Sequence, residues 1–196
     1  MGIAQSVRAW LISRPDAETR TAFDPEKIVY TPADLNDVDE IKALDSTIFV
    51  SWLAYSRDEY VDLVRGGPQL KAMLGGERII GFAAAEPPFD LNQSADAFDR
   101  HPDVSEVVRR VVAIDAPPCV YISTLSVAPD CRRRGVGSAL LGRLLASLDP
   151  AHLVALSVQP EWDRAIMLYR RHGFVDVGTT TWIAGSMLVM IRRPAV

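Results

Sequence analysis

The stretch that decides the fold runs from Leu125 to Leu140 and reads Leu-Ser-Val-Ala-Pro-Asp-Cys-Arg-Arg-Arg-Gly-Val-Gly-Ser-Ala-Leu. It starts as the end of an apolar strand, turns at a Pro-Asp pair and enters an amphipathic helix at the first glycine. Gly135 and Gly137 permit a positive φ and let the backbone come close to a ligand. The first amides of a helix bind phosphate, and three preceding arginines add positive charge. The stretch is therefore predicted to bind a phosphate or pyrophosphate at a helix N-terminus.

The spacing within this stretch excludes two common phosphate loops. A Walker loop needs Gly-Lys-Ser/Thr, whereas Gly137 is followed directly by Ser138. A dinucleotide-binding turn needs Gly-x-Gly-x-x-Gly close behind a strand. Here Leu140 takes the third glycine position, and seven residues lie between the strand and Gly135. The pattern that remains is Arg-x-x-Gly-x-Gly, which ends at Gly137.

A second motif lies downstream, over residues 163–174, and reads Asp-Arg-Ala-Ile-Met-Leu-Tyr-Arg-Arg-His-Gly-Phe. Together the two motifs resemble the GNAT superfamily of acyl-CoA-dependent N-acyltransferases. That family has a phosphate loop of the form Gln/Arg-x-x-Gly-x-Gly/Ala and a later element of the form Asn-x-x-Ala-x-x-Leu-Tyr-x-x-x-Gly-Phe. Both elements occur here in the family's order and at its usual separation, with a compatible strand between them. The resemblance covers about residues 27–192.

The resemblance implies an α/β (α+β) architecture, the GNAT fold. The central sheet of that fold is mixed and mostly antiparallel, is splayed between the fourth and fifth strands, and has helices on both faces. The fourth strand is expected over residues 119–127 and the fifth over residues 153–158. Residues 27–196 are expected to form this domain, with residues 1–26 as an N-terminal extension and residues 86–118 as an insertion between the third and fourth strands.

Capping signals and periodicity predict the other elements. Thr31 and Pro32 suit a helix start, with Thr31 as the cap and Asp34 reaching back to the cap amide. Ser56 and Glu59 form a second capping box. The further strands are expected over residues 27–31, 69–74, 78–85 and 182–192, and the further helices over residues 103–114, 135–148 and 161–172. The helix over 103–114 is expected to serve packing or an oligomer contact rather than to form a lid.

The resemblance also implies where acetyl-CoA binds. The cofactor is expected to enter the opening between the fourth and fifth strands, where pantetheine pairs with exposed backbone, and to place its pyrophosphate on the glycine-rich turn. The residues implied to bind it are Leu125, Ser126, Val127, Arg132, Arg133, Arg134, Gly135, Val136, Gly137, Ser138 and Asp163. Asp163 stands where many members carry Asn, and a carboxylate lacks the amide's donor.

The implied reaction is direct attack of an amine on the thioester. A tyrosine in the position of Tyr169 protonates the departing thiolate. The general base is open, because the positions at which some members carry Glu or His are Tyr121 and Ser123 here. An ordered water, Glu86 at the end of the third strand, or an amine that arrives deprotonated are the alternatives.

Charge is distributed unevenly along the 196 residues, whose formal net charge is −4. Residues 1–118 hold 12 basic and 20 acidic side chains, whereas residues 119–196 hold 9 and 5. The basic half contains the predicted phosphate site. An acidic approach from the other half would concentrate a cationic amine, which is a hypothesis about the acceptor.

Composition and spacing argue against several other functions. With 48% hydrophobic and 23% charged residues the chain is an ordinary globular sequence, and its acidic balance argues against nucleic acid. No apolar run is long enough for a membrane span, so no membrane partner is expected. The two cysteines fit a reducing compartment, and the three histidines share no metal-ligand spacing, so no metal is expected. We therefore expect a cytoplasmic protein that is a monomer or a homodimer.

The function expected from these features is that of a transferase, an N-acetyltransferase that moves acetyl from acetyl-CoA to a primary amine. A small-molecule amine is the expected acceptor. Two alternatives stay open, namely an acetyl-CoA-binding regulatory module with little catalysis and a protein or peptide N-acetyltransferase. Phe49, Trp52 and Tyr55 either line the acceptor pocket or belong to the core.

Overall fold

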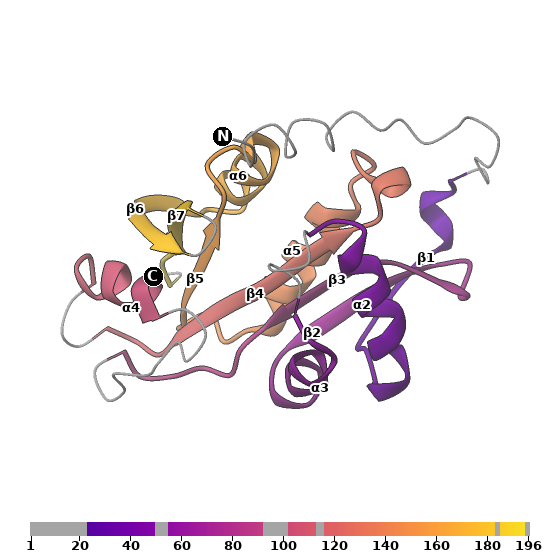
Figure 1. Ribbon diagram of the computed structural model, residues 1–196, viewed down its shortest axis with the longest axis horizontal. Coiled ribbons are helices and arrows are strands. Elements are labelled where there is room, and N and C mark those ends of the chain that lie inside the picture. The colour runs from indigo at the N-terminus through magenta and orange to yellow at the C-terminus, as the bar shows by residue number, and fades with distance from the viewer. Residues whose placement is uncertain (1–22, 50–54, 92–101, 113–115, 183–184, 195–196) are drawn as a thin grey trace, which may run out of the picture.

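The computed structural model describes residues 23–49, 55–91, 102–112, 116–182 and 185–194 (Figure 1). These residues hold a seven-stranded sheet of order β1-β2-β3-β4-β5-β7-β6. Its strands are β1 (Ile28–Thr31), β2 (Gln69–Leu74), β3 (Arg78–Ala85), β4 (Cys119–Val127), β5 (Leu153–Val158), β6 (Val175–Trp182) and β7 (Gly185–Arg192). The α-helices are α2 (Val38–Ser46), α3 (Arg57–Gly66), α4 (Pro102–Arg109), α5 (Val136–Ser147) and α6 (Asp163–Arg171).

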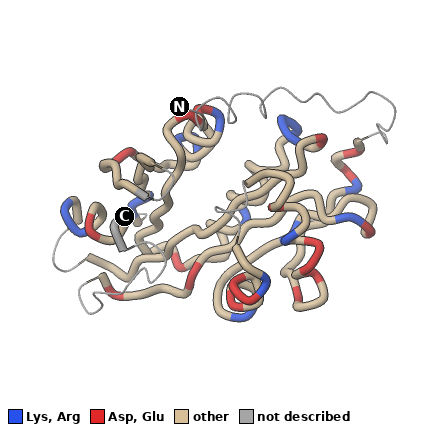
Figure 2. Tube along the Cα trace, in the orientation of Figure 1, with Lys and Arg blue, Asp and Glu red and all other residues tan. Residues whose placement is uncertain are grey.

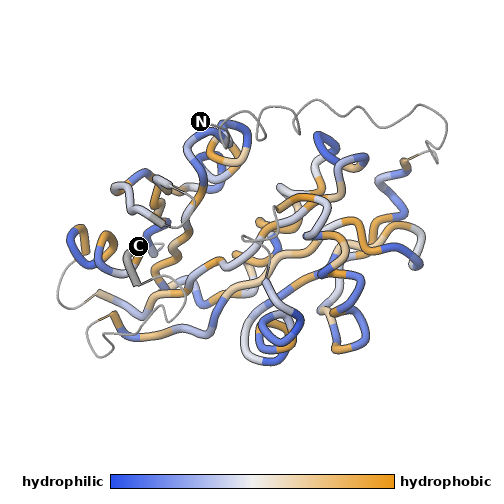
Figure 3. Tube along the Cα trace, in the orientation of Figure 1, coloured by the Kyte–Doolittle hydropathy of each residue, from blue (hydrophilic) through white to orange (hydrophobic). Residues whose placement is uncertain are grey.

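The sheet is mixed and mostly antiparallel, which confirms the predicted fold class. Every neighbouring pair of strands is antiparallel except β4 and β5, which run parallel. Parallel neighbours need a crossover connection, and α5 provides it. Apolar residues follow the central strands, whereas polar residues occupy the outer turns and helix surfaces (Figure 3).

Helices cover both faces of the sheet, as predicted. Gly81 and Phe82 follow one another in β3 and therefore point to opposite faces. The ring of Phe82 lies 6.4 Å from that of Tyr60 in α3. On the other face, a Cβ placed on Gly81 would lie 2.7 Å from Leu140 Cδ1 in α5. The missing side chain at Gly81 thus lets α5 pack closely on the strand.

The helix expected in the segment between the third and fourth strands is present as α4. It packs against β5, β6 and β7 at the end of the sheet away from β1. Val104, Val107 and Val108 are buried there in a second apolar cluster. A Cβ on Gly178 of β6 would lie 2.9 Å from Val107 Cγ1, so that glycine admits the helix. The helix therefore has a packing role, one of the two that the sequence predicted.

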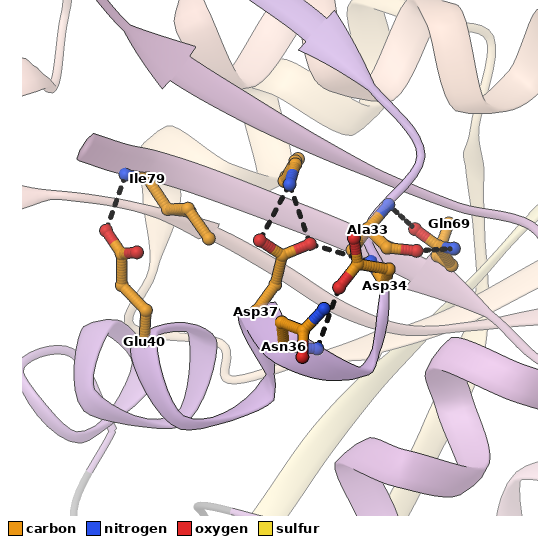
Figure 4. A network of polar contacts seen from close by, with 8 residues as sticks. Ala33, Asp34, Asn36, Asp37, Glu40, Gln69 and Ile79 are labelled. Atoms are coloured by element: carbon orange, nitrogen blue, oxygen red, sulfur yellow. Dashed lines mark hydrogen bonds and ion pairs between the residues drawn. The ribbon is translucent and has the colours of Figure 1, made fainter. Parts of the chain in front are cut away.

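The first helical segment starts later than predicted. Thr31 ends β1 in extended conformation, and Asp34 caps a 3-10 turn over Leu35–Asp37 that leads into α2. Asp34 Oδ1 accepts a hydrogen bond from the amide of Asn36 at 2.7 Å, and Asp37 Oδ2 accepts one from the amide of Asp34 at 2.6 Å (Figure 4). Asp37 also pairs with Lys71 Nζ of β2 at 2.7 Å. This mostly buried ion pair explains the late start, because it fixes Asp37 against the sheet.

The closing strand is a hairpin rather than the single strand predicted over 182–192. β6 has the sequence Val-Asp-Val-Gly-Thr-Thr-Thr-Trp, which lacks the apolar alternation of a half-buried strand. It forms nevertheless because β7 offers a pairing edge and β-branched threonines suit a strand. Elsewhere the predicted strand bounds agree with the structure within one residue, and Ser56 and Glu59 form the expected capping box.

Candidate active site

A break in the hydrogen bonding of the sheet marks the candidate site. β4 and β5 pair over three positions, of which the last joins Tyr121 to Ala155. Beyond it β4 continues to Val127 along β3, and β5 continues to Val158 along β7, without pairing to each other. A register shift against β3 falls opposite Ser123. The predicted splay is therefore present (Figure 1), and beyond Tyr121 it leaves this edge of β4 without a neighbouring strand.

The N-terminus of α5 faces this opening. Gly135, just before the helix, has a φ of 85°, in the left-handed region. The amide of Ala139 donates to the carbonyl of Gly135, so the amides of Val136, Gly137 and Ser138 form the open first turn. Such a turn with its positive dipole end binds an anion. The sequence predicted a helix N-terminus here, and its binding of a pyrophosphate stays a prediction.

Gly137 differs from Gly135 in its conformation. Among the described residues it is not one of the positive-φ glycines, so the expected positive φ applies to Gly135 alone. A Cβ on Gly137 would lie 3.4 Å from Val127 Cγ2 and 3.7 Å from Leu168 Cδ2. Gly137 therefore sits where β4, α5 and α6 meet, at ordinary contact distance from both neighbours.

The three arginines of the turn are exposed and have different surroundings, and they form the basic turn before α5 in Figure 2. Arg132 Nε donates to the carbonyl of Val127 at 3.1 Å, which is one of the β4 groups predicted to pair with pantetheine. Arg133 has a φ of 62°, in the left-handed region although it is not a glycine. The Arg134 guanidinium lies 4.4 Å from the centre of the Phe23 ring. Their predicted contact with the cofactor stays a prediction.

A polar cluster gathers at the end of β3, beside the opening. Ser123 Oγ donates to Glu86 Oε1 at 3.1 Å, and the Glu86 amide donates to the carbonyl of Tyr121 at 2.8 Å. The Tyr55 hydroxyl donates to the carbonyl of Ser123 at 3.2 Å. The hydroxyls of Tyr121 and Ser157 share a hydrogen bond of 2.7 Å. The residues considered for the general base thus lie close together. Ser157 of β5 lies with them, and nothing in the apolar sequence of that strand predicted this contact.

Tyr169 of α6 belongs to the same neighbourhood. It is buried, and its ring packs edge-on against Phe174 at 5.9 Å. Burial raises the pKa of Tyr169 to about 12, so its hydroxyl keeps its proton at neutral pH. Burial, followed by the nearby Tyr55, Glu86 and Tyr169, raises the pKa of Tyr121 as well. Two protonated phenols and one carboxyl group therefore face the same region.

The predicted β4 contacts alternate between two faces. Leu125 and Val127 are half-buried, whereas Ser126 is buried. On that buried face Thr124 Oγ1 lies 3.3 Å from Ser126 Oγ and from Asp45 Oδ2. The Ser126 side chain is therefore turned to the core, and its predicted contact with the cofactor stays a prediction. Sequence periodicity did not reveal Asp45, which faces the core on α2.

Asp163 lies on a different side of α6 from the residues that reach α5. It is exposed and lines a cavity of about 560 Å³ together with Met167, Arg170 and residues of β6 and β7. Leu168 and His172 instead face the start of α5. The predicted contact of Asp163 with the cofactor stays a prediction.

Two of the three aromatic residues after α2 lie in the described part of the chain, and each packs against another aromatic ring. Phe49 packs on Trp162, just before α6, with ring centres 5.7 Å apart. Tyr55 packs edge-on against Tyr60 at the same separation of 5.7 Å and also reaches β4. Trp52 lies outside the described residues. The Phe49–Trp162 contact joins the segment after α2 to the far side of the opening.

Two structural features are absent from the described residues. No helix in the described part of the chain is long and apolar enough to cross a membrane. In the same residues, no three His, Cys, Asp or Glu side chains gather as they would around a metal ion.

Comparison with known proteins agrees with this geometry. The model of the acetyltransferase (GNAT) family matches residues 36–174. No curated protein sequence matches the chain. Among solved structures, the chain is similar to Arabidopsis thaliana NAA60 in complex with a bisubstrate analogue, with 22% identity, a TM-score of 0.66, and coverage of 84% of this chain and 96% of that one. A second structure of NAA60 contains acetyl-CoA.

Two further structures have the same fold. Arabidopsis thaliana Naa50 in complex with the bisubstrate analogue CoA-Ac-MVNAL has 20% identity and a TM-score of 0.63, over 85% of this chain and 98% of that one. The ribosomal-protein-S18-alanine N-acetyltransferase from Escherichia coli has 16% identity and a TM-score of 0.61, over 86% of this chain and 95% of that one. At these identities the similarity establishes the fold.

Proposed function

Because the chain belongs to the acetyltransferase (GNAT) family, whose members use acetyl-CoA as co-substrate, we propose that it transfers acetyl from acetyl-CoA to a primary amine in a ternary complex. The observation that supports this most strongly is that β4 has no pairing with β5 beyond Tyr121 and that its end, at Val127, lies beside the open first turn of α5. An extended pantetheine arm fits a strand edge, and a pyrophosphate fits a helix N-terminus.

The cofactor is held, in this proposal, by three kinds of group. The backbone groups of Leu125 and Val127, which alternate with those that Ser126 and Ala128 turn to β3, pair with the pantetheine amides. The amides from Gly135 to Ser138 bind the pyrophosphate, and the arginines 132–134 add charge around it. Arg132 would have to release the carbonyl of Val127 for that group to pair with pantetheine.

Tyr169 is the proposed general acid. The amine nitrogen attacks the thioester carbonyl carbon, the C–S bond breaks, and the sulfur leaves with the electron pair. Because burial keeps the pKa of Tyr169 at about 12, the phenol is protonated at neutral pH and can donate its proton to the thiolate.

Glu86 is the proposed acceptor for the amine proton. It lies at the end of β3, it receives the Ser123 hydroxyl, and it raises the pKa of Tyr121 by its charge. The proton passes to the carboxylate either directly or through a water, and a carboxylate in this place also favours a cationic amine over an anionic acceptor.

The test of the acid is Tyr169→Phe, measured as thiol release with a responsive amine. Turnover is expected to fall by about 10²–10⁴-fold, the usual range for general acid–base help, while the dissociation constant of acetyl-CoA stays within about twofold. Tyr30→Phe is the matched control, because Tyr30 lies on the edge strand β1 and contacts Arg143. Unchanged turnover in Tyr169→Phe removes this tyrosine from the acid's role.

The acceptor is either a small-molecule amine or the amine of a peptide or protein. The names of the similar structures favour the second, since NAA60 and Naa50 were solved with bisubstrate analogues and the Escherichia coli enzyme acts on an alanine of ribosomal protein S18. Thiol release with matched panels of small amines, N-terminal peptides and lysine peptides separates the two. Tight acetyl-CoA binding without release in any panel would instead indicate a binding module.

A further inference from the structure

His172, the residue that follows α6, lies over the first turns of α5. Its Nε2 shares a hydrogen bond of 2.9 Å with Ser138 Oγ. Ser138 and Gly142 lie one helical turn apart on one face of α5. A Cβ on Gly142 would come within 3.3 Å of His172 Cε1, so the glycine leaves room for the imidazole. The ring is thus seated on α5 by packing and by a hydrogen bond.

Within the part of the chain that the structure describes, the charged groups that act on this ring are cationic. Arg171 of α6 and Arg192 of β7 act on it electrostatically, while α5 presents the uncharged Ser138 and Gly142. The charged side chain of α5, Arg143, lies over the Tyr30 ring instead. Burial first, and then Arg171 and Arg192, lower the pKa of His172 below its ordinary value of 6.5. Without a ligand the imidazole is therefore neutral at pH 7.5.

We propose that His172 takes up a proton from solvent when the pyrophosphate of an acyl-CoA binds, and so positions Ser138 as a donor to the phosphate. This inference rests on the proposed binding of the pyrophosphate at the first turn of α5. His172 acts through Ser138 and through its charge, and it is a positioning residue rather than a catalytic one.

The proton changes the direction of one hydrogen bond. Neutral imidazole has one donor and one acceptor nitrogen, so the Ser138 hydroxyl hydrogen can be committed to Nε2. Protonated imidazole is a donor at both nitrogens, so Nε2–H donates to Ser138 Oγ. The serine hydrogen is then available to a phosphate oxygen. The dianionic pyrophosphate also offsets the repulsion from Arg171 and Arg192.

The sign of the pH dependence follows from linkage. An anion next to His172 raises the pKa of the bound state above that of the free state, by about one pH unit or more for an opposite charge within ~4–6 Å. Cofactor affinity therefore rises as pH falls through the bound-state pKa and levels off below the free-state pKa. A bound-state pKa that is higher by about one corresponds to roughly a tenfold gain in affinity over that range.

Isothermal titration calorimetry with CoA at pH 6.5, in buffers of different ionisation enthalpy, tests the proposal. It measures the number of protons that are taken up when CoA binds. Wild type is expected to take up a fraction of a proton more than His172→Gln, because glutamine keeps hydrogen-bonding groups but has no titratable charge. His152→Gln is the matched control, since His152 lies beyond the opposite end of α5. Repeating the titration with dephospho-CoA removes the ligand's phosphate monoester, which itself titrates near pH 6.

The outcomes separate this inference from the proposed function. Equal proton uptake by wild type and His172→Gln, with CoA binding intact, overturns the role of His172 and leaves the function standing. Failure of wild type to bind CoA overturns both. If His172→Gln does not fold, a pH titration of the histidine proton resonances of wild type, with and without CoA, tests the proposal instead. Saturation with CoA is expected to raise the pKa of His172. An unchanged or lowered value contradicts the proposal.

Discussion

The two glycines of the Arg-x-x-Gly-x-Gly turn are expected to respond oppositely to the same substitution. Gly135 has a φ of 85° and ends the turn before α5, whereas Gly137 lies within the first turn of α5. Gly135→Ala and Gly137→Ala each add one methyl group, two residues apart. The two variants therefore distinguish a requirement for a positive φ from a requirement for a small side chain.

The magnitude for Gly135 comes from the backbone alone. No heavy atom lies within 4 Å of a Cβ built at this position, so no clash contributes. An L-residue held in the left-handed region costs roughly 1–2 kcal/mol. Gly135→Ala is thus expected to lower the free energy of unfolding by about 1–2 kcal/mol.

Gly137→Ala should leave the fold as stable as wild type or more so. Its Cβ would meet Val127 Cγ2 at 3.4 Å and Leu168 Cδ2 at 3.7 Å, both ordinary contacts. Alanine is favoured over glycine in a helix by up to about 1 kcal/mol. The expected change in the free energy of unfolding is therefore from zero to a gain of about 1 kcal/mol.

Urea unfolding followed by circular dichroism measures both variants, and the slope m should not change. Gly135→Asn serves as a graded control, because asparagine tolerates the left-handed region better than alanine and should fall between wild type and Gly135→Ala. The reasoning is refuted if Gly137→Ala loses as much stability as Gly135→Ala, or if Gly135→Ala is neutral.

Two further predictions concern groups that contradict local rules. Arg133→Gly should raise the free energy of unfolding by about 0.5–1 kcal/mol, because glycine adopts a φ of 62° without strain. The control Arg134→Gly should lower the free energy of unfolding. The same urea titration measures both variants, and a loss of stability in Arg133→Gly contradicts the proposed strain. Asp45→Asn should gain on wild type in the free energy of unfolding between pH 4 and 7. Burial raises the pKa of Asp45 above 3.8, so its contribution to stability is present at low pH and lost as pH rises through the folded-state value. The gain is about 1.4 kcal/mol for each pH unit by which the folded-state pKa exceeds that of the unfolded chain, and a stability difference that does not change with pH contradicts it.

Local chemistry explains why much of the secondary structure was predictable. The hairpin over 69–85, the Ser56 capping box and the fifth strand each depend on residues within a few positions of one another. The predicted bounds were wrong where a contact with a residue distant in sequence outweighed the local signals. Asp37 is fixed by Lys71 on β2, and that contact moved the helix start away from Thr31. β6 likewise forms because β7 pairs with it.

The sequence by itself determined the glycine- and arginine-rich turn before α5, because its glycines, its arginines and the following helix are contiguous and their effect is local. It also determined the two motifs on which the family resemblance rests. Only the tertiary structure decided which side chains meet.

Glu86 directly follows β3, Tyr121 lies in β4 and Tyr169 lies in α6, and the fold brings the three into one region at the point where β4 and β5 separate. His172 and Ser138 are 34 residues apart and meet because the end of α6 lies over the first turns of α5. Such contacts depend on strand register and on helix packing across the sheet, and no short window of sequence contains that information.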